Sequence, residues 1–382
     1  MSALGTLMFN LLPIVIGMSI DTLALSAEDG SLLVSFYFIG FLCACMLSPY
    51  VTKQFKWIHV AFVGIFLMII GLFLIAQVAS YYYVLMFFIL IGAGSGTLFS
   101  LAIVILSLTE CPERYFGIKI IFEQITSAIL LFIVPTFILI YFGFSGSFLF
   151  ISLVVFLIGF AALSLPNNQA AEQLIKTGLS TDNLLPKTVN KINIWLALIC
   201  LCLFFGTLST LWAFVERLAV ANELSADSIG LALSISVLGG AVGGLLAAYL
   251  GDRLPLRLSI LFIVPLLLTV IWTFYLGFDM WLFGLAAFSL SLLWNFSLTY
   301  QMKIVIMQDE SKSSWLAAFI ALGGIIIPAL GGIVLGQFGW HTLFIVISVM
   351  LILCSLGFYY LAKPSQTVQQ VVEGARIPPS IT

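Results

Sequence analysis

Charged residues make up only 8% of this 382-residue sequence, so a charged side chain inside a long apolar run is a candidate for chemistry. Asp21, in the segment SIDTLALSAEDG, is the first of them. A carboxylate at this position could bind and release a proton or attract a cation. Two interpretations of Asp21 remain open: it lies within a membrane helix, or the helix ends earlier and leaves it at the interface with water.

A second group of ionisable residues lies in the apolar run 115–141. Lys119, Glu123 and Ser127 follow one another at four-residue spacing, which places them on one face of a helix. Glu123 could act as a proton site or as a gate, with Lys119 as its partner. The alternative interpretation is a structural ion pair in which Lys119 extends to the nearer interface.

The segment STLWAFVER (209–217) combines an aromatic ring with charges. Ser209, Trp212 and Glu216 share one helix face, and Arg217 is adjacent. An aromatic ring one turn from a carboxylate suits a cationic or aromatic ligand. The alternative is that these residues belong to the belt of Trp and charged side chains at a membrane interface.

The segment LLWNFSLTYQMK (292–303) contains Trp294 and Asn295 near the middle of an apolar run. An amide buried in lipid is costly unless it meets a polar partner. Both residues are therefore candidates for contacts with a ligand.

The other residue types indicate no catalytic or metal site and no cofactor. His59 and His341 are expected on opposite faces of a membrane, and all the cysteines except Cys111 are expected to pack within apolar helices. The sequence contains no phosphate-binding G-x-x-x-x-G-K-[ST] motif, which argues against ATP as its energy source. A net charge of −2 gives no support for nucleic-acid binding.

Composition indicates that these residues are positioned by membrane helices. The sequence is 62% hydrophobic and only 8% charged, whereas about 25% of the residues of a soluble domain are charged. At about 20 residues per crossing, the apolar share suffices for about twelve helices. The runs predict membrane spans at 4–27, 31–50, 58–78, 81–108, 115–141, 146–165, 193–217, 227–250, 256–277, 280–306, 314–336 and 341–362.

Polar segments predict the domain organisation and the orientation. An N-terminal six-helix bundle (1–165) and a C-terminal one (193–362) are expected on either side of a cytoplasmic linker (166–192), followed by a disordered cytoplasmic tail (363–382). With both termini in the cytoplasm, eleven of the 14 basic residues fall in cytoplasmic segments. We therefore expect a multi-pass protein of the cell (inner) membrane, in contact with the lipid bilayer.

The loop between the eighth and ninth predicted spans reads AYLGDRLPLR (248–257). It resembles the loop signature of the major facilitator superfamily, small-x-Leu-small-Asp-Arg-x-Gly-x-Arg, through Asp252, Arg253 and Arg257. Pro255 replaces the usual glycine. An acid there caps a helix start, and the arginines can pair with carboxylates on neighbouring helix ends, which would hold two bundles together at one side.

The equivalent stretch of the first half, SPYVTKQFKW (48–57), begins 200 residues earlier and retains the basic residues Lys53 and Lys56. The acid and the glycine of the signature are replaced there by Thr52 and Phe55. The two stretches are candidate gating loops of a paired-repeat transporter.

The resemblance implies an all-α polytopic membrane protein with twelve transmembrane helices in two six-helix bundles. It also implies a monomeric secondary transporter that works by alternating access, with a small organic or amphipathic solute, and protons where transport is coupled, as its partners. Spans one, four, seven and ten would line the cavity, which makes Asp21, Trp212, Glu216, Trp294 and Asn295 candidate contacts.

Alternatives remain within and outside this class. The acid in span one resembles that of drug–proton antiporters, which favours an exporter of amphiphiles. The absence of an arginine before Gly92, and of a Gly/Pro-rich motif in span five, counts against it. A lipid-modifying membrane enzyme would need a cluster of His, Asp, Glu or Cys near one interface, and the sequence predicts none.

Overall fold

Long apolar segments of this sequence form helices almost without interruption in the computed structural model. The structure describes residues 1–78, 80–107, 112–165, 191–250, 253–254, 256–276, 279–308 and 315–362. Its elements are α1 (Ser2–Leu23), α2 (Ala27–Gln54), α3 (Trp57–Gln77), α4 (Tyr81–Ser107), α5 (Pro112–Ile133), the π-helix η1 (Val134–Ile138), α6 (Leu139–Gly159), the 3₁₀-helix η2 (Phe160–Ser164), α8 (Lys191–Ala221), α9 (Ala226–Leu250), α10 (Leu256–Thr273), α11 (Met280–Gln308) and α12 (Trp315–Leu361).

The number of crossings follows from two glycines. Nine helices within the described ranges are long and apolar enough to cross a membrane, and two of them extend over 47 residues. Each of these two is broken by a glycine with positive φ, Gly143 (φ 65°) and Gly339 (φ 75°), so each contains two crossings. With the shorter apolar helix α10, the described helices are consistent with the twelve predicted crossings.

The end of α1 differs from the predicted span 4–27. The helix stops at Leu23, and Ala24 adopts a left-handed conformation (φ 51°). Ser26 then caps α2: its hydroxyl oxygen accepts the Asp29 N–H (3.1 Å), and the Asp29 carboxylate accepts the Ser26 N–H (3.3 Å). Because of this capping box, α2 begins at Ala27 and not at the predicted residue 31. The box provides hydrogen-bond acceptors for backbone N–H groups of the first turn, which have no partner within the helix. Asp21 therefore lies in the last turn of α1.

Glycines allow the helices of each half to pack closely, in a repeated pattern. A Cβ at Gly40 of α2 would overlap the carbonyl oxygen of Ile89 in α4. A Cβ at Gly239 of α9 would overlap the carbonyl oxygen of Phe288 in α11. Gly239 and Phe288 each follow their counterparts by 199 residues, so the same close contact recurs at the same place in both halves of the sequence.

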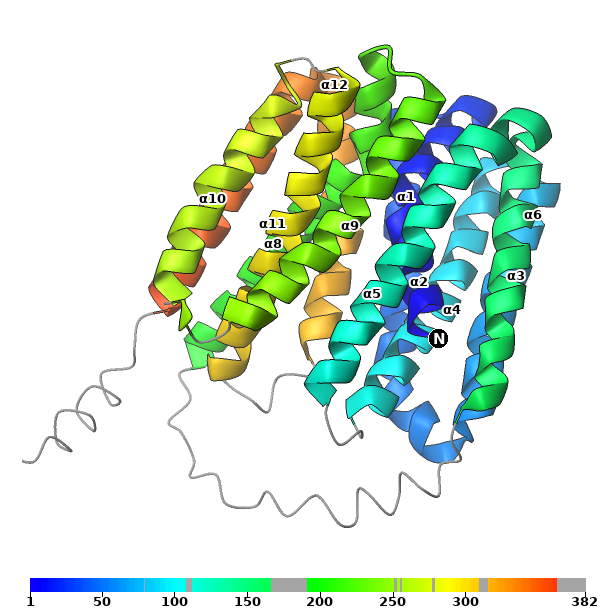
Figure 1. The fold of residues 1–382 in the computed structure, drawn as a ribbon, viewed down its shortest axis with the longest axis horizontal. Helices are drawn as coiled ribbons and strands as arrows, with labels where there is room; N and C mark the ends of the chain where they lie inside the picture. The colour runs from blue at the N-terminus through cyan, green and yellow to red at the C-terminus, as the bar shows by residue number, and fades with distance from the viewer. Residues whose placement is uncertain are drawn as a thin grey trace, which may run out of the picture.

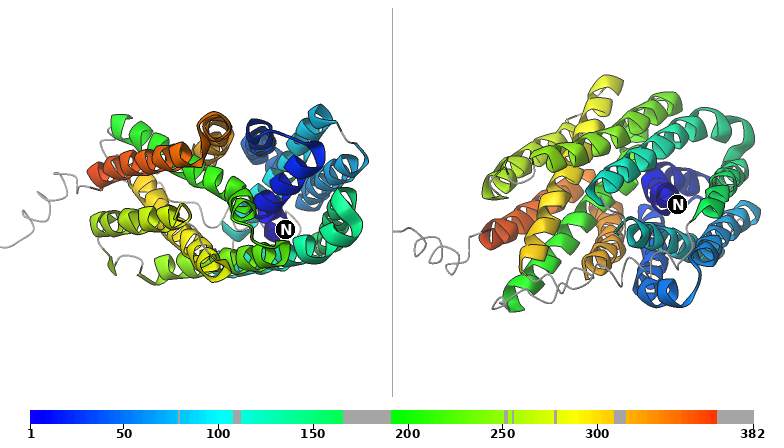
Figure 2. Two further views of the ribbon diagram at one scale, coloured as in Figure 1. Left: turned by 90° about the horizontal axis from the view of Figure 1, so that it is seen from above. Right: turned by 60° about the horizontal axis from the view of Figure 1, so that its bottom comes forward.

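The two groups of helices, α1–α6 and α8–α12, lie side by side (Figures 1 and 2). Contact between the groups is made chiefly by α2 with α12, α5 with α9, and α1 with α8. The Ser35 hydroxyl of α2 donates to the Ile325 carbonyl of α12 at 2.7 Å. The central interface is therefore formed by helices from both groups.

The two ends of the bundle differ in charge. Lys53, Lys56 and Arg253 are exposed at the end where α2 and α9 finish, which we call the basic end. Arg217 lies near the end of α8, at the opposite end of the bundle. This opposite end also holds the α1–α2 turn and the breaks at Gly143 and Gly339.

Candidate functional site

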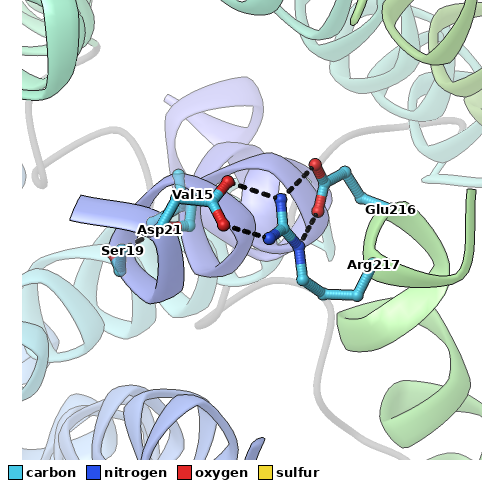
Figure 3. A network of polar contacts seen from close by, with 5 residues as sticks. All are labelled: Val15, Ser19, Asp21, Glu216 and Arg217. Carbon is cyan, nitrogen blue, oxygen red and sulfur yellow. Dashed lines mark hydrogen bonds and ion pairs between the residues drawn. The ribbon is translucent and has the colours of Figure 1, made fainter. Parts of the chain in front are cut away.

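At the opposite end, Arg217 of α8 lies between two carboxylates (Figure 3). Its guanidinium donates to both oxygens of Asp21 in α1, with Nη2 2.9 Å from Oδ2. It also donates to Glu216, from Nε at 2.6 Å and from Nη2 at 2.8 Å. Asp21 is 63% exposed, whereas Glu216 is 12% and Arg217 16% exposed. Among the ion pairs of the described residues, Asp21–Arg217 joins the two halves.

At this ion triad Gly17 of α1 faces the Glu216 carboxylate of α8. A Cβ at Gly17 would overlap the carboxylate of Glu216, so a larger residue could not face it without moving this side chain. Two recesses flank the triad, and Arg217 lines both. The recess of about 290 Å³ is lined by Ile20, Ala27, Phe214, Arg217, Leu335, Gly339 and Trp340. The other, of about 160 Å³, lies between α1, η1, α6, α8 and α9. The triad therefore lies between two recesses at this end of the bundle.

Deeper in the interface, four rings from four helices of both halves pack together. The Phe9 ring of α1 stacks on Phe205 of α8 (5.7 Å between centroids) and lies edge-on to Phe38 of α2 (5.7 Å) and to Trp294 of α11 (5.9 Å). Phe205 also contacts Phe38 (5.9 Å) and Trp294 (5.6 Å). We call these four residues the central ring cluster. It fills the space between the halves at the level of Trp294, midway along α11.

Polar groups border this cluster. The Trp212 indole Nε1–H of α8 donates to the backbone carbonyl of Phe9, at 3.2 Å, across the two halves. The Ser209 hydroxyl is buried and has no hydrogen-bond partner within the described residues. Ser209 lies on the α8 face that also carries Phe205 and Trp212. The Tyr37 hydroxyl is buried too, close to Ser95 and to the Phe9 backbone. The centre thus combines apolar rings with a few buried hydroxyls.

Asn295 lies away from the rings, toward α9 and α5. Its Nδ2 donates to the Ser291 carbonyl at 3.0 Å and would lie 2.8 Å from a Cβ at Gly240. The Gln124 amide nitrogen would lie 3.6 Å from the same Cβ. Amide side chains from both halves therefore lie close to the same glycine. Sequence spacing does not predict this arrangement, because Gln124, Gly240 and Asn295 are far apart in the chain.

A polar seam joins α1 to α5 within the first half. The Lys119 ammonium lies 2.7 Å from the Glu123 carboxylate, both side chains are nearly buried, and the Ser2 hydroxyl donates to the same carboxylate oxygen. Further along, the Asn10 amide donates to the Ser127 hydroxyl at 2.8 Å. The predicted Lys119–Glu123 pairing is thus present in the structure, and Asn10 is a buried polar contact that the sequence analysis did not identify.

At the predicted gating loop the structure describes contacts between arginines and aromatic rings. Arg253 lies with its guanidinium 4.9 Å above the Tyr249 ring, and Arg257 lies 5.9 Å from the Tyr359 ring. Within the described residues, neither forms an ion pair with a carboxylate. Lys53 and Lys56 are exposed. Asp252 lies outside the described residues, and so do the acids of the 309–314 loop.

No group of three or more His, Cys, Asp or Glu side chains in the described ranges is arranged to hold a metal ion. The site is therefore built from an ion triad, aromatic rings, amides and hydroxyls.

Comparisons with known proteins identify relatives of this architecture. The sequence matches the family model described as Major Facilitator Superfamily, over residues 1–306 and 197–381. A comparison with curated protein sequences finds no match. Similar solved structures include a mutant of the nucleoside transporter NupG, at 15% identity and a TM-score of 0.77, covering 95% of this chain and 98% of that one.

Two further solved structures are similar along nearly the whole chain. One is a D-xylose–proton symporter, at 16% identity and a TM-score of 0.70, covering 95% of this chain and 98% of that one. The other is the xylose transporter XylE from E. coli in a partially occluded, inward-open conformation, at 12% identity and a TM-score of 0.72. It covers 96% of this chain and 97% of that one. At sequence identities of 12–16%, the similarity to these three structures shows that the chain shares their fold.

Proposed function

This chain belongs to the major facilitator superfamily, and from that premise we propose that it carries a small organic or amphipathic solute by alternating access. The observation that carries the proposal is the central ring cluster. Phe9 and Phe38 come from the first half and Phe205 and Trp294 from the second, so a solute held between them would touch both halves. Rocking of the halves would then expose the solute first to one end and then to the other.

The ion triad supports a role as a gate. Asp21 and Arg217 bring α1 and α8 together at the opposite end, and Gly17 allows Glu216 into the same contact. We propose that this end is extracytoplasmic and that the basic end is cytoplasmic, since exposed Lys and Arg gather there. In this orientation the structure is closed toward the outside, and both termini lie in the cytoplasm.

The lining supports a solute with a large apolar face. Four rings and the Trp212 indole surround the centre, with few hydroxyls and amides between them. A polyhydroxylated sugar would leave several of its hydroxyls unpaired against such rings, which is costly. An aromatic or amphipathic solute fits this centre better than a sugar such as the xylose carried by two of the similar structures.

We propose proton coupling through the α1–α5 seam. Glu123 is 4% exposed, forms an ion pair with Lys119 and lies on a helix that contacts α9 of the other half. A carboxylate in this position could exchange its bond to Lys119 for a proton when the halves move. Asp21, in contrast, is 63% exposed and paired with Arg217, so we assign the proton to Glu123 and not to Asp21.

Solute exchange in proteoliposomes tests the transporter proposal. Purified protein should show saturable counterflow with aromatic or amphipathic solutes, and the same solutes should raise its melting temperature by mass action. Trp294→Ala should weaken both effects, because it removes a ring of the centre. Trp195→Ala is the matched control, since this indole is 44% exposed near the basic end. Absence of saturable exchange for every solute, with folded protein, would contradict the proposal.

A further inference from the structure

A proline in α1 leaves one backbone carbonyl without its helical partner. In an α-helix the carbonyl of residue 9 accepts the N–H of residue 13, but Pro13 has no N–H. The Phe9 carbonyl is therefore free to bind outside its own helix. It lies in the central ring cluster, because the Phe9 side chain stacks on Phe205 and meets Trp294.

The donor that binds the Phe9 carbonyl comes from the other half. The Trp212 indole N–H donates to the Phe9 carbonyl at 3.2 Å, and the Trp212 side chain is 3% exposed. A motion that parts α1 from α8 must break this bond. It then leaves one acceptor and one donor unpaired inside the membrane, which is unfavourable for each group.

A solute that enters as the halves part can satisfy both groups. It needs an N–H to replace the indole donor at the Phe9 carbonyl, and an acceptor to receive the Trp212 N–H. It also needs a flat apolar body, because the rings of Phe38, Phe205 and Trp294 surround this position.

We propose that the preferred solute is a planar heteroaromatic compound with an N–H donor and a carbonyl acceptor, bound between the Phe9 carbonyl and the Trp212 indole. This inference rests on the proposed transport function and names the substrate class of the same site. In the closed structure Trp212 occupies the place of the solute's donor. The buried Ser209 hydroxyl offers a further contact to a polar substituent.

Binding of matched compounds to the purified full-length protein tests the substrate class. The probes are 2-pyridone and 2-quinolone, each compared with its N-methyl derivative, which lacks the donor and keeps the ring and the carbonyl. Wild-type protein should bind the N–H compounds about tenfold more tightly than the N-methyl compounds, the ratio expected for one buried hydrogen bond.

Two variants test the two contacts separately. Pro13→Ala restores an N–H that competes for the Phe9 carbonyl, so the preference for N–H over N-methyl compounds should fall toward one. Trp212→Phe keeps a ring but removes the donor, so the preference for 2-quinolone over indole, which has no acceptor, should fall. Pro265→Ala in α10 is the control for loss of a helix proline and should keep both ratios.

Ratios measured within one variant are insensitive to a general loss of folded protein. Equal binding of N–H and N-methyl compounds by wild-type protein, no binding of either, or a preference that survives Pro13→Ala would overturn the inference. If other solutes still exchange in proteoliposomes, the transporter proposal stands and only the substrate class is wrong. If none exchanges, both fail.

Discussion

Arg217 binds two carboxylates that differ in their exposure to water. Glu216 is its neighbour in α8 and is largely buried, so this contact belongs to one half of the protein. Asp21 comes from the other half and is 63% exposed, so water and salt screen this pair, and such pairs contribute about 1 kcal/mol or less. A contact of that strength can close an end of the protein without preventing it from opening.

Removal of the Asp21 charge should therefore favour opening of this end by a modest factor. In a cysteine-free background, Met18→Cys places a thiol in the 160 Å³ recess beside the triad. Adding Asp21→Asn should raise its labelling rate by a membrane-impermeant maleimide by up to about fivefold, the factor that corresponds to 1 kcal/mol. Asp279→Asn removes an acid at the same end that caps α11, and should leave the rate unchanged. A rate unaffected by Asp21→Asn would argue against the gate.

Glu123 offers a test of coupling at the level of one residue. If this carboxylate carries the proton, Glu123→Gln should abolish solute accumulation driven by a pH gradient while counterflow continues. The double variant Lys119→Met/Glu123→Gln removes both charges of the buried pair and controls for an unpaired lysine. Accumulation that still follows the pH gradient in both variants would make the pair structural.

The spacing of residues revealed some parts of the site and not others. Trp212, Glu216 and Trp294 were found because a polar or aromatic group in an apolar run is conspicuous. Gly17 and the Phe9 carbonyl were not predicted. A glycine or a backbone carbonyl stands out only when its partner on another helix is known, and the sequence does not show which helices are neighbours. The partner of Asp21 was missed for the same reason: Arg217 lies 196 residues later.

At the scale of elements, the lengths of the apolar runs predicted the helices. The exact residues at which the helices end depend on local features such as caps, glycines and prolines. The break between the fifth and sixth spans was predicted between 141 and 146, and it occurs at Gly143 because only glycine readily adopts its positive φ. The π-helix at Val134–Ile138 was not predicted. Pro135 explains it in retrospect, since a missing N–H disturbs the helical hydrogen bonds.

The repeated glycine contacts lead to a prediction about stability. Gly40→Ala and Gly239→Ala should each destabilise the protein by about 1–3 kcal/mol, because the new methyl group meets a backbone carbonyl that cannot move freely. Gly244→Ala is the control, since its Cβ would lie 3.7 Å from Ile120 Cδ1, an ordinary contact. Thermal unfolding in detergent measures all three. Equal melting temperatures for the three variants would contradict close packing at these positions.

At the scale of the whole molecule, the sequence predicted two similar halves but not where charged side chains pair across them. The halves follow from the number and length of apolar runs and from the equivalent loops of the two halves. This pairing depends on which weak contacts form across the interface between the halves. The composition of each helix alone does not predict those contacts. Pairing between the halves is seen at Asp21 and Arg217, whereas the loop motif directed attention to the basic end.

A reversible crosslink at the opposite end tests whether the halves must part there for transport. Glu28 of α2 and Gly336 of α12 belong to different halves, and a Cβ at Gly336 would lie 3.2 Å from Glu28 Cγ. A cysteine sulfur in the place of that Cγ is within disulfide reach of a cysteine at 336.

The oxidised Glu28→Cys/Gly336→Cys protein should lose solute exchange, and a reductant should restore it, because the bond holds α2 against α12 with this end closed. The two single variants control for loss of the Glu28 charge and of the glycine, and each should keep its exchange under oxidation. Binding of solute from the basic end should persist in the crosslinked protein, since the closure leaves that end free to open. Exchange that continues after complete crosslinking would show that the solute does not pass between these halves at this end.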